Sequence, residues 1–535
     1  MTDDRALERL ARLTRERAGG RRLTRREFAA AAGAAGLSAG AAATLWADAA
    51  RAEPKRGGLF RVGMHDGNTS DSHDPGRYNS STALQTAHAH RSYLTMITPE
   101  NALGPDMATA WEASPDARVW TFELERRASF HSGRPFTAED AVASLNHHRG
   151  PDSASAARAL LADVTDVRAD GPHRLVVELE IGNADLPWLM TDYHLTMCPA
   201  DGAGGIDWRS GDGAGPYRLT NVEFGVGATF ERHDGWHGTG AWFDALEFVV
   251  LNDPNARQSE LLTGRLDAVS QIDLKTKALL EAMPAITVEN VPSAAAVTLP
   301  MHCDTPPFDA LDVRLALKHA VDRAEIVEKV FFDAAIVGDD NHVAPSMPYH
   351  APRPPRLYDP DRARFHLKKA GAEGLTVSLS AADGVQAGAV DLCTLYAAQA
   401  ARAGITINVV REPNDSYWSD VWLKKPFCCA VWGPRPTPDV LFSLGYRAGA
   451  EWNESRWENP RFNALLLAAK GELDQPRRAE MYAEMQTLLA DDGGTVIPLF
   501  KNFAYARRAT VARPAQVAAS WELDGARATS RWWFA

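Results

Sequence analysis

One stretch, residues 106–144, constrains the fold most, because it predicts three successive elements. Residues 119–124 (VWTFEL) alternate apolar and polar side chains, as a half-buried strand does. A turn containing Gly133 follows. Thr137 and Asp140 then have the spacing of a capping box, in which each side chain accepts from the other residue's backbone N–H. The sequence therefore predicts a strand, a tight turn and a helix that starts at Thr137.

The rest of the chain continues this mixture of strands and helices. Strands are expected at 175–179 and 243–251, and helices at 254–262, 361–370 and 477–489. An apolar stripe over 312–330 predicts one helix capped by Asp312. Residues 376–410 read as strand, helix and strand, which is typical of an α/β lobe. The expected fold class is α/β.

Length and charge limit the kinds of partner. With 535 residues and 45% apolar residues, the chain is long enough for two to four domains. A formal charge of -12 argues against nucleic acid or an anionic membrane surface as partner.

The first 52 residues differ from the rest and predict an export signal. They hold ten Arg against six acidic residues, then an Ala-rich stretch and an A-x-A site at 50–52. Arg25, Arg26 and Phe28 resemble the twin-arginine signal, so the Tat export machinery is an expected partner. No Cys precedes Cys198, which disfavours a lipid anchor. The expected location is the periplasm, as a soluble protein.

The five cysteines do not suggest a metal site. No CxxC and no Cys/His pair at zinc spacing occurs. One disulfide is compatible with an oxidising compartment, but its pairing cannot be read from the sequence. Cys428 and Cys429 lie in an apolar run, for which strand packing is the expected role.

Several further motifs, in order, resemble one family. The chain is similar to the family 5 extracellular solute-binding proteins, the dipeptide, oligopeptide and nickel receptors of ABC importers. The motifs are PDMATAW at 105–111, WTFEL at 120–124, FHSGRPFTAED at 130–140, GAGPYRL at 213–219, LTGRLD at 262–267, and PPF at 306–308 with Val313, Arg314, Ala320, Asp322 and Arg323.

This resemblance implies a two-lobed clamshell with an additional α+β domain. The first lobe would comprise 53–90, 215–305 and 490–535, the additional domain 91–214, and the second lobe 306–489. Such receptors have no active site and no cofactor; they close on a ligand and dock on a membrane permease. We expect a monomer that delivers a peptide-like or other small solute to an ABC permease.

The resemblance also indicates a ligand loop, WGPRPTPD at 432–439, which reaches the cleft in this family. Its prolines stiffen it, and Gly433 permits close backbone approach to a ligand. Peptide binders commonly carry an Asp three residues after Trp432, where it pairs with the ligand's amino terminus. Here that position is Arg435. A guanidinium attracts carboxylate or phosphonate, so an anionic ligand group is predicted; an ion pair with Asp439 is the alternative.

Other candidate contacts rest on residue type or on the family's first lobe. Aromatic walls sequester solutes, with core packing as the alternative for each residue. The aromatic candidates are Trp432, Tyr417, Trp418 and Tyr446, and the polar candidates from the first lobe are Asn79, Ser80 and Thr82. The pairs His88 with His90 and His147 with His148 project to different faces of their expected helices, which argues against a metal site.

The competing interpretation is an exported hydrolase or metalloenzyme. Twin-arginine export carries folded proteins, often with cofactors. Against this class, the sequence has no H-E-x-x-H and no P-loop, and its G-x-S-x-G match at 36–40 falls in the predicted leader. A chemoreceptor partner or exported chaperone on the same scaffold is a third possibility.

Overall fold

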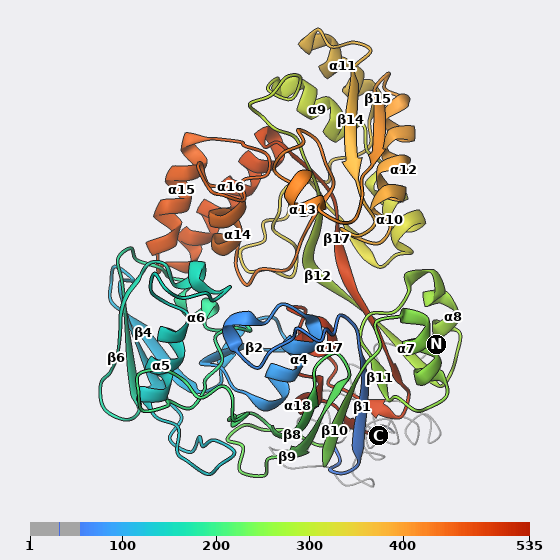
Figure 1. The fold of residues 1–535 in the computed structure, drawn as a ribbon. Helices are drawn as coiled ribbons and strands as arrows, with labels where there is room; N and C mark the ends of the chain where they lie inside the picture. Colours follow the sequence, from blue (N-terminus) through green and yellow to red (C-terminus); the bar gives the residue numbers. More distant parts are fainter. Residues whose placement is uncertain (1–31, 33–53) are drawn as a thin grey trace.

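The computed structural model describes Ala32 and residues 54–535, so Arg25, Arg26 and Phe28 lie outside the described residues. Within 54–535 the chain is an α/β protein with an upper and a lower lobe (Figure 1). Two long strands, β12 (Ile286–Pro300) and β17 (Thr495–Arg508), pair antiparallel and run from one lobe into the other. The two lobes are therefore tied by a continuous ribbon.

The largest sheet contains both crossing strands. Its nine strands run in the order β16-β12-β17-β11-β1-β10-β9-β8, with β13 paired to β17. β1 pairs parallel with β10, while β8 to β10 form an antiparallel meander. The bounds are β1 Leu59–Met64, β8 Tyr217–Glu223, β9 Gly227–Arg232, β10 Ala245–Val250, β11 Ala268–Val269, β13 Ala335–Val337 and β16 Ala430–Trp432.

A separate four-stranded antiparallel sheet forms the left of the lower lobe in Figure 1. Helix α5 (Ala138–His147) packs against it, and Thr137 and Asp140 form the predicted capping box, with Thr137 at the N-cap. The predicted strands at 119–124 and 175–179 are confirmed here. The sheet consists of β4 Ala108–Ala113, β5 Val119–Leu124, β7 Arg174–Leu179 and β6 Val164–Ala169.

The upper lobe contains the predicted strand, helix and strand over 376–410. β14 (Thr376–Ala381) and β15 (Thr406–Arg411) pair parallel, with α12 (Ala389–Ala401) between them along the chain. Cys428 and Cys429 are buried just before β16, and all five cysteines are free thiols, so no disulfide forms among them.

One predicted helix in this lobe is wrong. The stripe over 312–330 forms two helices, α9 (Leu311–His319) and α10 (Arg323–Phe331). The second helix starts because the Asp322 side chain accepts from the Glu325 N–H at 3.1 Å, which caps a new N-terminus. Asp312 does not cap α9; its carboxylate instead accepts from His366 at 2.7 Å.

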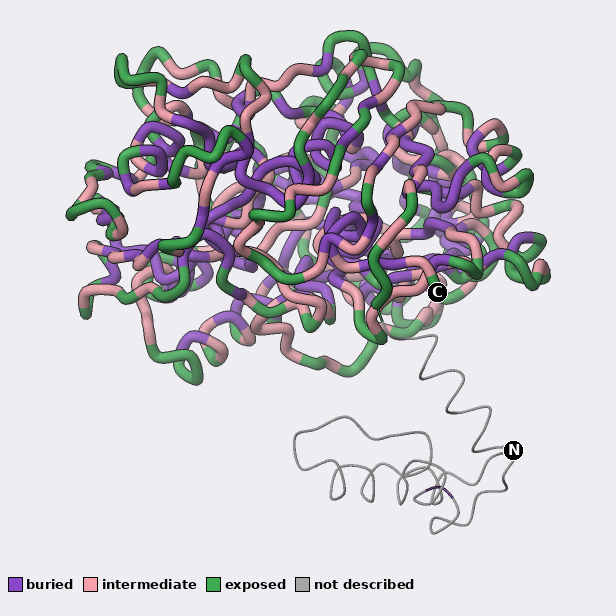
Figure 2. Tube along the Cα trace, turned by 90° about the horizontal axis from the view of Figure 1, so that it is seen from below, coloured by how far each residue is buried: buried purple, intermediate pink, exposed green. Residues whose placement is uncertain are grey.

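Helices cover both lobes, and buried and exposed residues are interspersed along the chain (Figure 2). The predicted helices at 254–262, 361–370 and 477–489 are confirmed as α7, α11 and α16. The remaining elements are α4 Ser81–His90, β2 Thr95–Ile97, β3 Leu103–Pro105, α6 Leu186–Leu189, α7 Pro254–Leu262, α8 Lys277–Glu281, α11 Pro360–Ala370, α13 Tyr417–Asp420, α14 Pro438–Gly445, α15 Pro460–Gly471, α16 Gln475–Asp492, β18 Val511–Ala512, α17 Glu522–Gly525, α18 Ala528–Arg531 and β19 Trp533–Phe534, with short 3-10 turns at Pro75–Arg77, Arg158–Leu161 and Leu274–Thr276.

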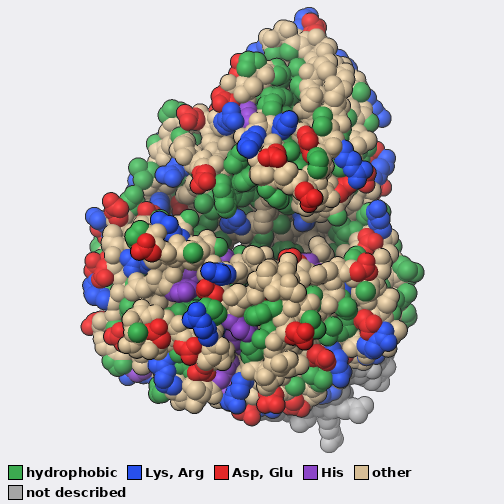
Figure 3. Space-filling view, viewed as in Figure 1, with side chains coloured by type: hydrophobic (Ala, Val, Ile, Leu, Met, Phe, Trp, Pro, Cys, Tyr) green, Lys and Arg blue, Asp and Glu red, His purple; other side chains and the backbone are tan. Residues whose placement is uncertain are grey.

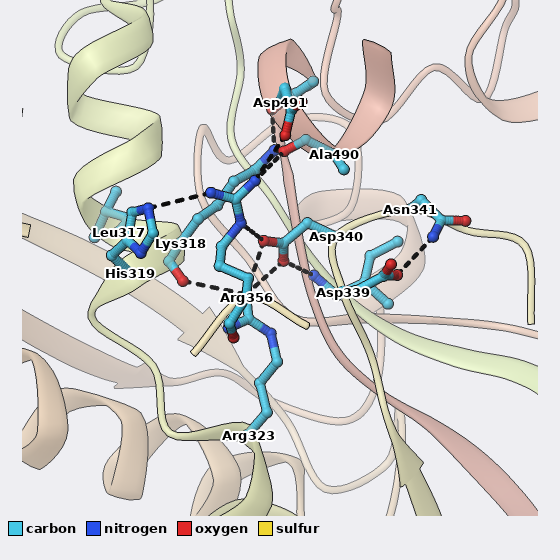
Figure 4. A network of polar contacts seen from close by, with 12 residues as sticks. Leu317, Lys318, His319, Arg323, Asp339, Asp340, Asn341, Arg356, Ala490 and Asp491 are labelled. Atoms are coloured by element: carbon cyan, nitrogen blue, oxygen red, sulfur yellow. Dashed lines mark hydrogen bonds and ion pairs between the residues drawn. The ribbon is translucent and has the colours of Figure 1, made fainter. Parts of the chain in front are cut away.

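A buried ionic network organises the upper lobe around Asp340 (Figure 4). Arg323 donates to both carboxylate oxygens of Asp340, at 2.7 and 2.8 Å, and Arg356 lies 2.9 Å from the same group. The Ile497 N–H of β17 also donates to Asp340, at 3.0 Å. Arg323, which carried part of the family resemblance, therefore holds α10 to the crossing strand.

Candidate ligand-binding site

A cavity of about 300 Å³ lies where three distant parts of the chain meet. Its walls come from residues 156–194 beside the four-stranded sheet, 434–452 in the upper lobe and 519–527 near the C-terminus, with a few residues of other segments. Figure 3 shows that the molecule is hollowed between its upper and lower parts. A cavity of this size suits a small solute, since ligand sites begin at about 300 Å³.

The loop between β16 and α14 carries Arg435 to the cavity wall. β16 ends at Trp432, and α14 begins at Pro438 with Thr437 as its N-cap residue. Two further prolines, Pro434 and Pro436, flank Arg435 and line the cavity with it. Because proline fixes its own φ angle, the backbone on both sides of Arg435 loses little conformational freedom when the protein folds.

Arg435 has no acidic partner in the structure from residue 54 onward. Its guanidinium donates to the carbonyl oxygens of Gly433 at 3.3 Å and Pro434 at 3.1 Å, and lies 5.8 Å from the Trp432 ring centroid. Burial lowers the pKa of Arg435, while the charge of Asp192 opposes that shift. The alternative pairing with Asp439 does not form: Asp439 is buried and accepts from Tyr482 at 3.4 Å. Arg435 thus presents positive charge to the cavity.

Asp192 also lines the cavity, from the turn after α6. Its Oδ1 accepts from the backbone N–H of His194 at 3.0 Å and from the His194 ring at 2.7 Å. Although burial opposes ionisation, these hydrogen bonds hold the pKa of Asp192 below its usual value. Asp192 is therefore an ionised carboxylate at the cavity wall.

Aromatic and apolar side chains make up most of the remaining wall. Tyr193 and Trp521 meet edge to face, with ring centroids 5.4 Å apart. Trp188, Met347 and Trp452 also line the cavity. Such walls exclude water and strengthen the electrostatic contacts that a bound solute makes.

Two other basic residues at the cavity, His88 and Arg527, carry no free positive charge. Burial, the largest cause, lowers the pKa of His88 to about 3, so its imidazole is uncharged at neutral pH. Arg527 forms an ion pair with Asp106 at 3.1 Å. The positive charge of Arg435 is therefore available to a ligand.

The structure places the predicted aromatic contacts away from the cavity wall. Tyr417 is buried, and its hydroxyl donates to the carbonyl oxygens of Ser380 and Cys429. Tyr446 is also buried, with its hydroxyl 2.9 Å from His342 Nδ1. Trp418 is 46% exposed, and Trp432 packs in the core behind the loop. Gly433 is exposed beside Arg435.

The three polar candidates of the lower lobe lie at the start of α4. Ser80 is the N-cap residue and accepts from the Ala83 N–H at 3.0 Å, while Thr82 donates to the His65 carbonyl at 2.8 Å. Asn79 is exposed. Of these, Thr82 lines a small hollow of about 20 Å³ that is separate from the main cavity. The hydroxyls of Ser80 and Thr82 therefore form hydrogen bonds within the protein itself.

Sequence reasoning missed the residues that complete the cavity: Trp188, Asp192, Tyr193, His194, Trp452 and Trp521. Asp192, Tyr193 and His194 are adjacent and combine a charge, an aromatic ring and an imidazole, which is the only local signal. Nothing in the sequence around Trp521 links it to residues more than 300 positions earlier.

The histidine pairs serve the fold. His90 Nδ1 donates to the Thr86 carbonyl oxygen at 2.7 Å, while His147 contacts Asp74 at 2.7 Å and His148 contacts Ser155 at 2.7 Å. No group of three metal-ligating side chains gathers within the described residues. In the same part of the chain, no helix has the length and apolar character needed to cross a membrane.

Comparison with known proteins identifies a family and relatives that this chain resembles. The family model for bacterial extracellular solute-binding proteins, family 5, matches residues 102–454. The dipeptide-binding protein of Escherichia coli K12 is 23% identical over 439 residues, covering 74% of this chain and 80% of that protein.

Solved structures resemble the whole clamshell. The ABC transporter substrate-binding protein CtaP of Listeria monocytogenes superposes with a TM-score of 0.77 at 19% identity, covering 90% of this chain and 100% of that one. AgaA from Agrobacterium tumefaciens R10, solved with agropinic acid, gives 0.72 at 18% identity, covering 89% and 99%. The two-lobed α/β fold expected from the sequence is confirmed. The chain belongs to the bacterial extracellular solute-binding proteins of family 5.

Proposed function

We propose that this protein captures a small solute in the cavity between its lobes and delivers it to an ABC permease, without chemical change to the solute. The observation that carries the proposal is Arg435, a cation without a carboxylate partner among residues 54–535, at the wall of an apolar cavity. A group with a free charge in a desolvated site is costly unless a ligand compensates it.

The arrangement of the cavity supports capture by closure. Its walls belong to both lobes, so the cavity exists in this form only when the lobes are together. We assign residues 53–90, 215–305 and 490–535 to the first lobe, 91–214 to the additional domain and 306–489 to the second lobe. We further propose a soluble periplasmic monomer, exported through the twin-arginine route.

The matched proteins support a peptide-like or conjugated amino-acid solute. The E. coli relative is named for dipeptides and the Agrobacterium protein was solved with agropinic acid. Both ligand types carry carboxylate groups, which a guanidinium binds well.

Native mass spectrometry tests the proposal first. The protein from residue 53 onward is measured before and after mild denaturation and refolding. A stoichiometric small molecule that is released on unfolding supports a receptor, and its mass and charge identify the solute. A stoichiometric metal or covalent cofactor would favour an enzyme instead.

The Arg435→Ala variant tests the residue. A charge-assisted hydrogen bond contributes about 1.5–3 kcal/mol, so the variant should bind the solute about tenfold or more weakly by calorimetry. Arg411→Ala is the matched control, since this arginine is exposed and pairs with Asp383 at 3.2 Å. Equal affinity of the Arg435 variant and the parent protein would contradict the proposed role.

A further inference from the structure

The charges do not balance where the helices α14 to α16 of the upper lobe contact the region of the four-stranded sheet. Arg478 of α16 pairs with Asp185, the residue before α6, at 2.6 Å. Lys470 of α15 pairs with Asp163. Asp439 of α14 has no ion pair within 4.0 Å among residues 54–535. One carboxylate is therefore left without a cation at this contact.

The surroundings of Asp439 disfavour its ionised form. The charged and titratable groups that act on it are Asp185 from the region of the four-stranded sheet, Lys470 from α15, and Arg478 and Tyr482 from α16. Asp439 is 3% exposed, and its carboxylate accepts only a long hydrogen bond within the described chain, from the Tyr482 hydroxyl at 3.4 Å. A buried carboxylate with so little compensation is costly, so the neutral acid is favoured.

Asp185 provides an acceptor for the proton of that acid. Arg478 donates to Oδ1 of Asp185, whereas Oδ2 is buried and has no donor within residues 54–535. The charge of Asp185 is also the largest cause, after burial, that raises the pKa of Asp439. A proton on Asp439 removes this repulsion and supplies a donor beside an unused buried oxygen.

We propose that closure of the lobes takes up one proton, which Asp439 holds beside Asp185, so that solute capture is linked to pH. This inference rests on the proposed function and adds a control to it. The helices α14 to α16 lie above α6 in Figure 1, and Val440 of α14 packs in one apolar cluster with Leu186 of α6. The same contact therefore buries both acids, and opening returns Asp439 to water, where its carboxyl group ionises.

The direction of the linkage follows from the two states. Burial, the largest cause, and the charge of Asp185 raise the pKa of Asp439 to about 7 in the closed structure, from an ordinary value of 3.8. Between these values the closed form holds a proton that the open form lacks. The ratio of closed to open protein should therefore fall by up to about tenfold per pH unit from about pH 4 to about pH 7, and stay constant above that range.

Small-angle X-ray scattering of the protein from residue 53 onward, without added solute, tests the linkage. The parent should have a smaller radius of gyration at pH 5 than at pH 8, because its closed-to-open ratio is about a hundredfold higher at pH 5. Asp439→Asn is neutral at both pH values and can donate to Asp185, so its radius should stay small at both. Asp415→Asn is the control, since Asp415 is exposed in a loop of the same lobe, and it should behave as the parent does.

Infrared difference spectra between pH 6 and pH 8 detect the proton itself. The parent and Asp415→Asn should show the carbonyl band of a protonated carboxyl group at pH 6, and this band should be smaller by one carboxyl group in Asp439→Asn. Equal bands in the parent and Asp439→Asn would overturn the inference.

The scattering result can overturn it as well. A parent radius that does not change with pH, or an equal change in Asp439→Asn, would show that closure is not linked to this proton. Either result leaves solute capture untouched, because native mass spectrometry tests capture separately. Conversely, failure to find a solute would leave the pH dependence of closure standing.

Discussion

Burial raises the pKa of a single carboxyl group next to the ligand loop, that of Asp439. It belongs to α14, is buried, and accepts from the Tyr482 hydroxyl at 3.4 Å. Burial is the largest cause that raises the pKa of Asp439 to about 7, and the neighbouring charge of Asp185 adds to it. The protein therefore takes up a proton here that the unfolded chain would release.

This residue predicts a pH dependence of stability. Because the folded pKa lies above the unfolded value of 3.8, the folded state binds the proton more tightly, and stability falls as the pH rises from about 4 to about 7. Asp439→Asn should remove this contribution, so the variant should gain stability relative to the parent at pH 7.5 but not at pH 4. Urea unfolding at both pH values measures the difference.

Asp415→Asn serves as the control for that experiment, since Asp415 is exposed in a loop of the same lobe. Its stability relative to the parent should be the same at both pH values. A parallel shift of Asp439→Asn at the two pH values would contradict the prediction.

At the level of elements, the GAGPY motif places a loop against the end of α4. A Cβ atom on Gly215 would lie 2.5 Å from the His90 carbonyl carbon and 2.6 Å from the Arg91 nitrogen. A Cβ atom on Gly213 would lie 1.9 Å from the His90 oxygen. These neighbours are backbone atoms that cannot turn aside. The two glycines of the motif therefore allow the loop backbone to pack directly against the backbone at the end of α4.

Gly215→Ala should destabilise the protein by about 1–3 kcal/mol or more, because the added methyl group forces the loop away from α4. Thermal unfolding followed by circular dichroism measures the loss. Gly433→Ala is the comparison: its Cβ would approach only the flexible Arg435 side chain, at 3.6 Å, so stability should change little. Equal stability of the two variants would refute the packing role.

At the level of the whole molecule, a buried ion pair joins the region of the four-stranded sheet to the helices of the upper lobe. Arg478 of α16 donates to Asp185 at 2.6 Å, and the two side chains are 1% and 0% exposed. Beside them, the Ala184 N–H donates to the Lys470 carbonyl at 2.7 Å, and Lys470 pairs with Asp163. These contacts cross between parts that closure brings together.

Arg478→Met should favour an open arrangement, because closure would then bury Asp185 without its partner, at a cost of about 3–5 kcal/mol. We expect a larger radius of gyration by small-angle X-ray scattering and weaker solute binding. Arg477→Met, on the same helix but exposed, is the control and should change neither. An unchanged radius in the Arg478 variant would show that other contacts hold the lobes.

The sequence by itself determined the local elements and the family. The capping box at Thr137 and Asp140 and the helix that ends at Ala370 are confirmed, because the signals for helix ends act through neighbours a few residues away. The division at Ala320 was missed, since the apolar stripe runs through both helices while Asp322 alone starts the second. Arg435 was singled out because the resemblance marked its position.

Tertiary structure alone decided what surrounds Arg435. Asp192 and Trp521 reach the cavity through the packing of both lobes, and no local pattern relates positions so far apart in the chain. Packing likewise assigned Tyr417 and Tyr446 to the core, because their hydroxyls find hydrogen-bond partners there. Residue type suggests which side chains can bind a solute, whereas the burial and partners of each one decide which do.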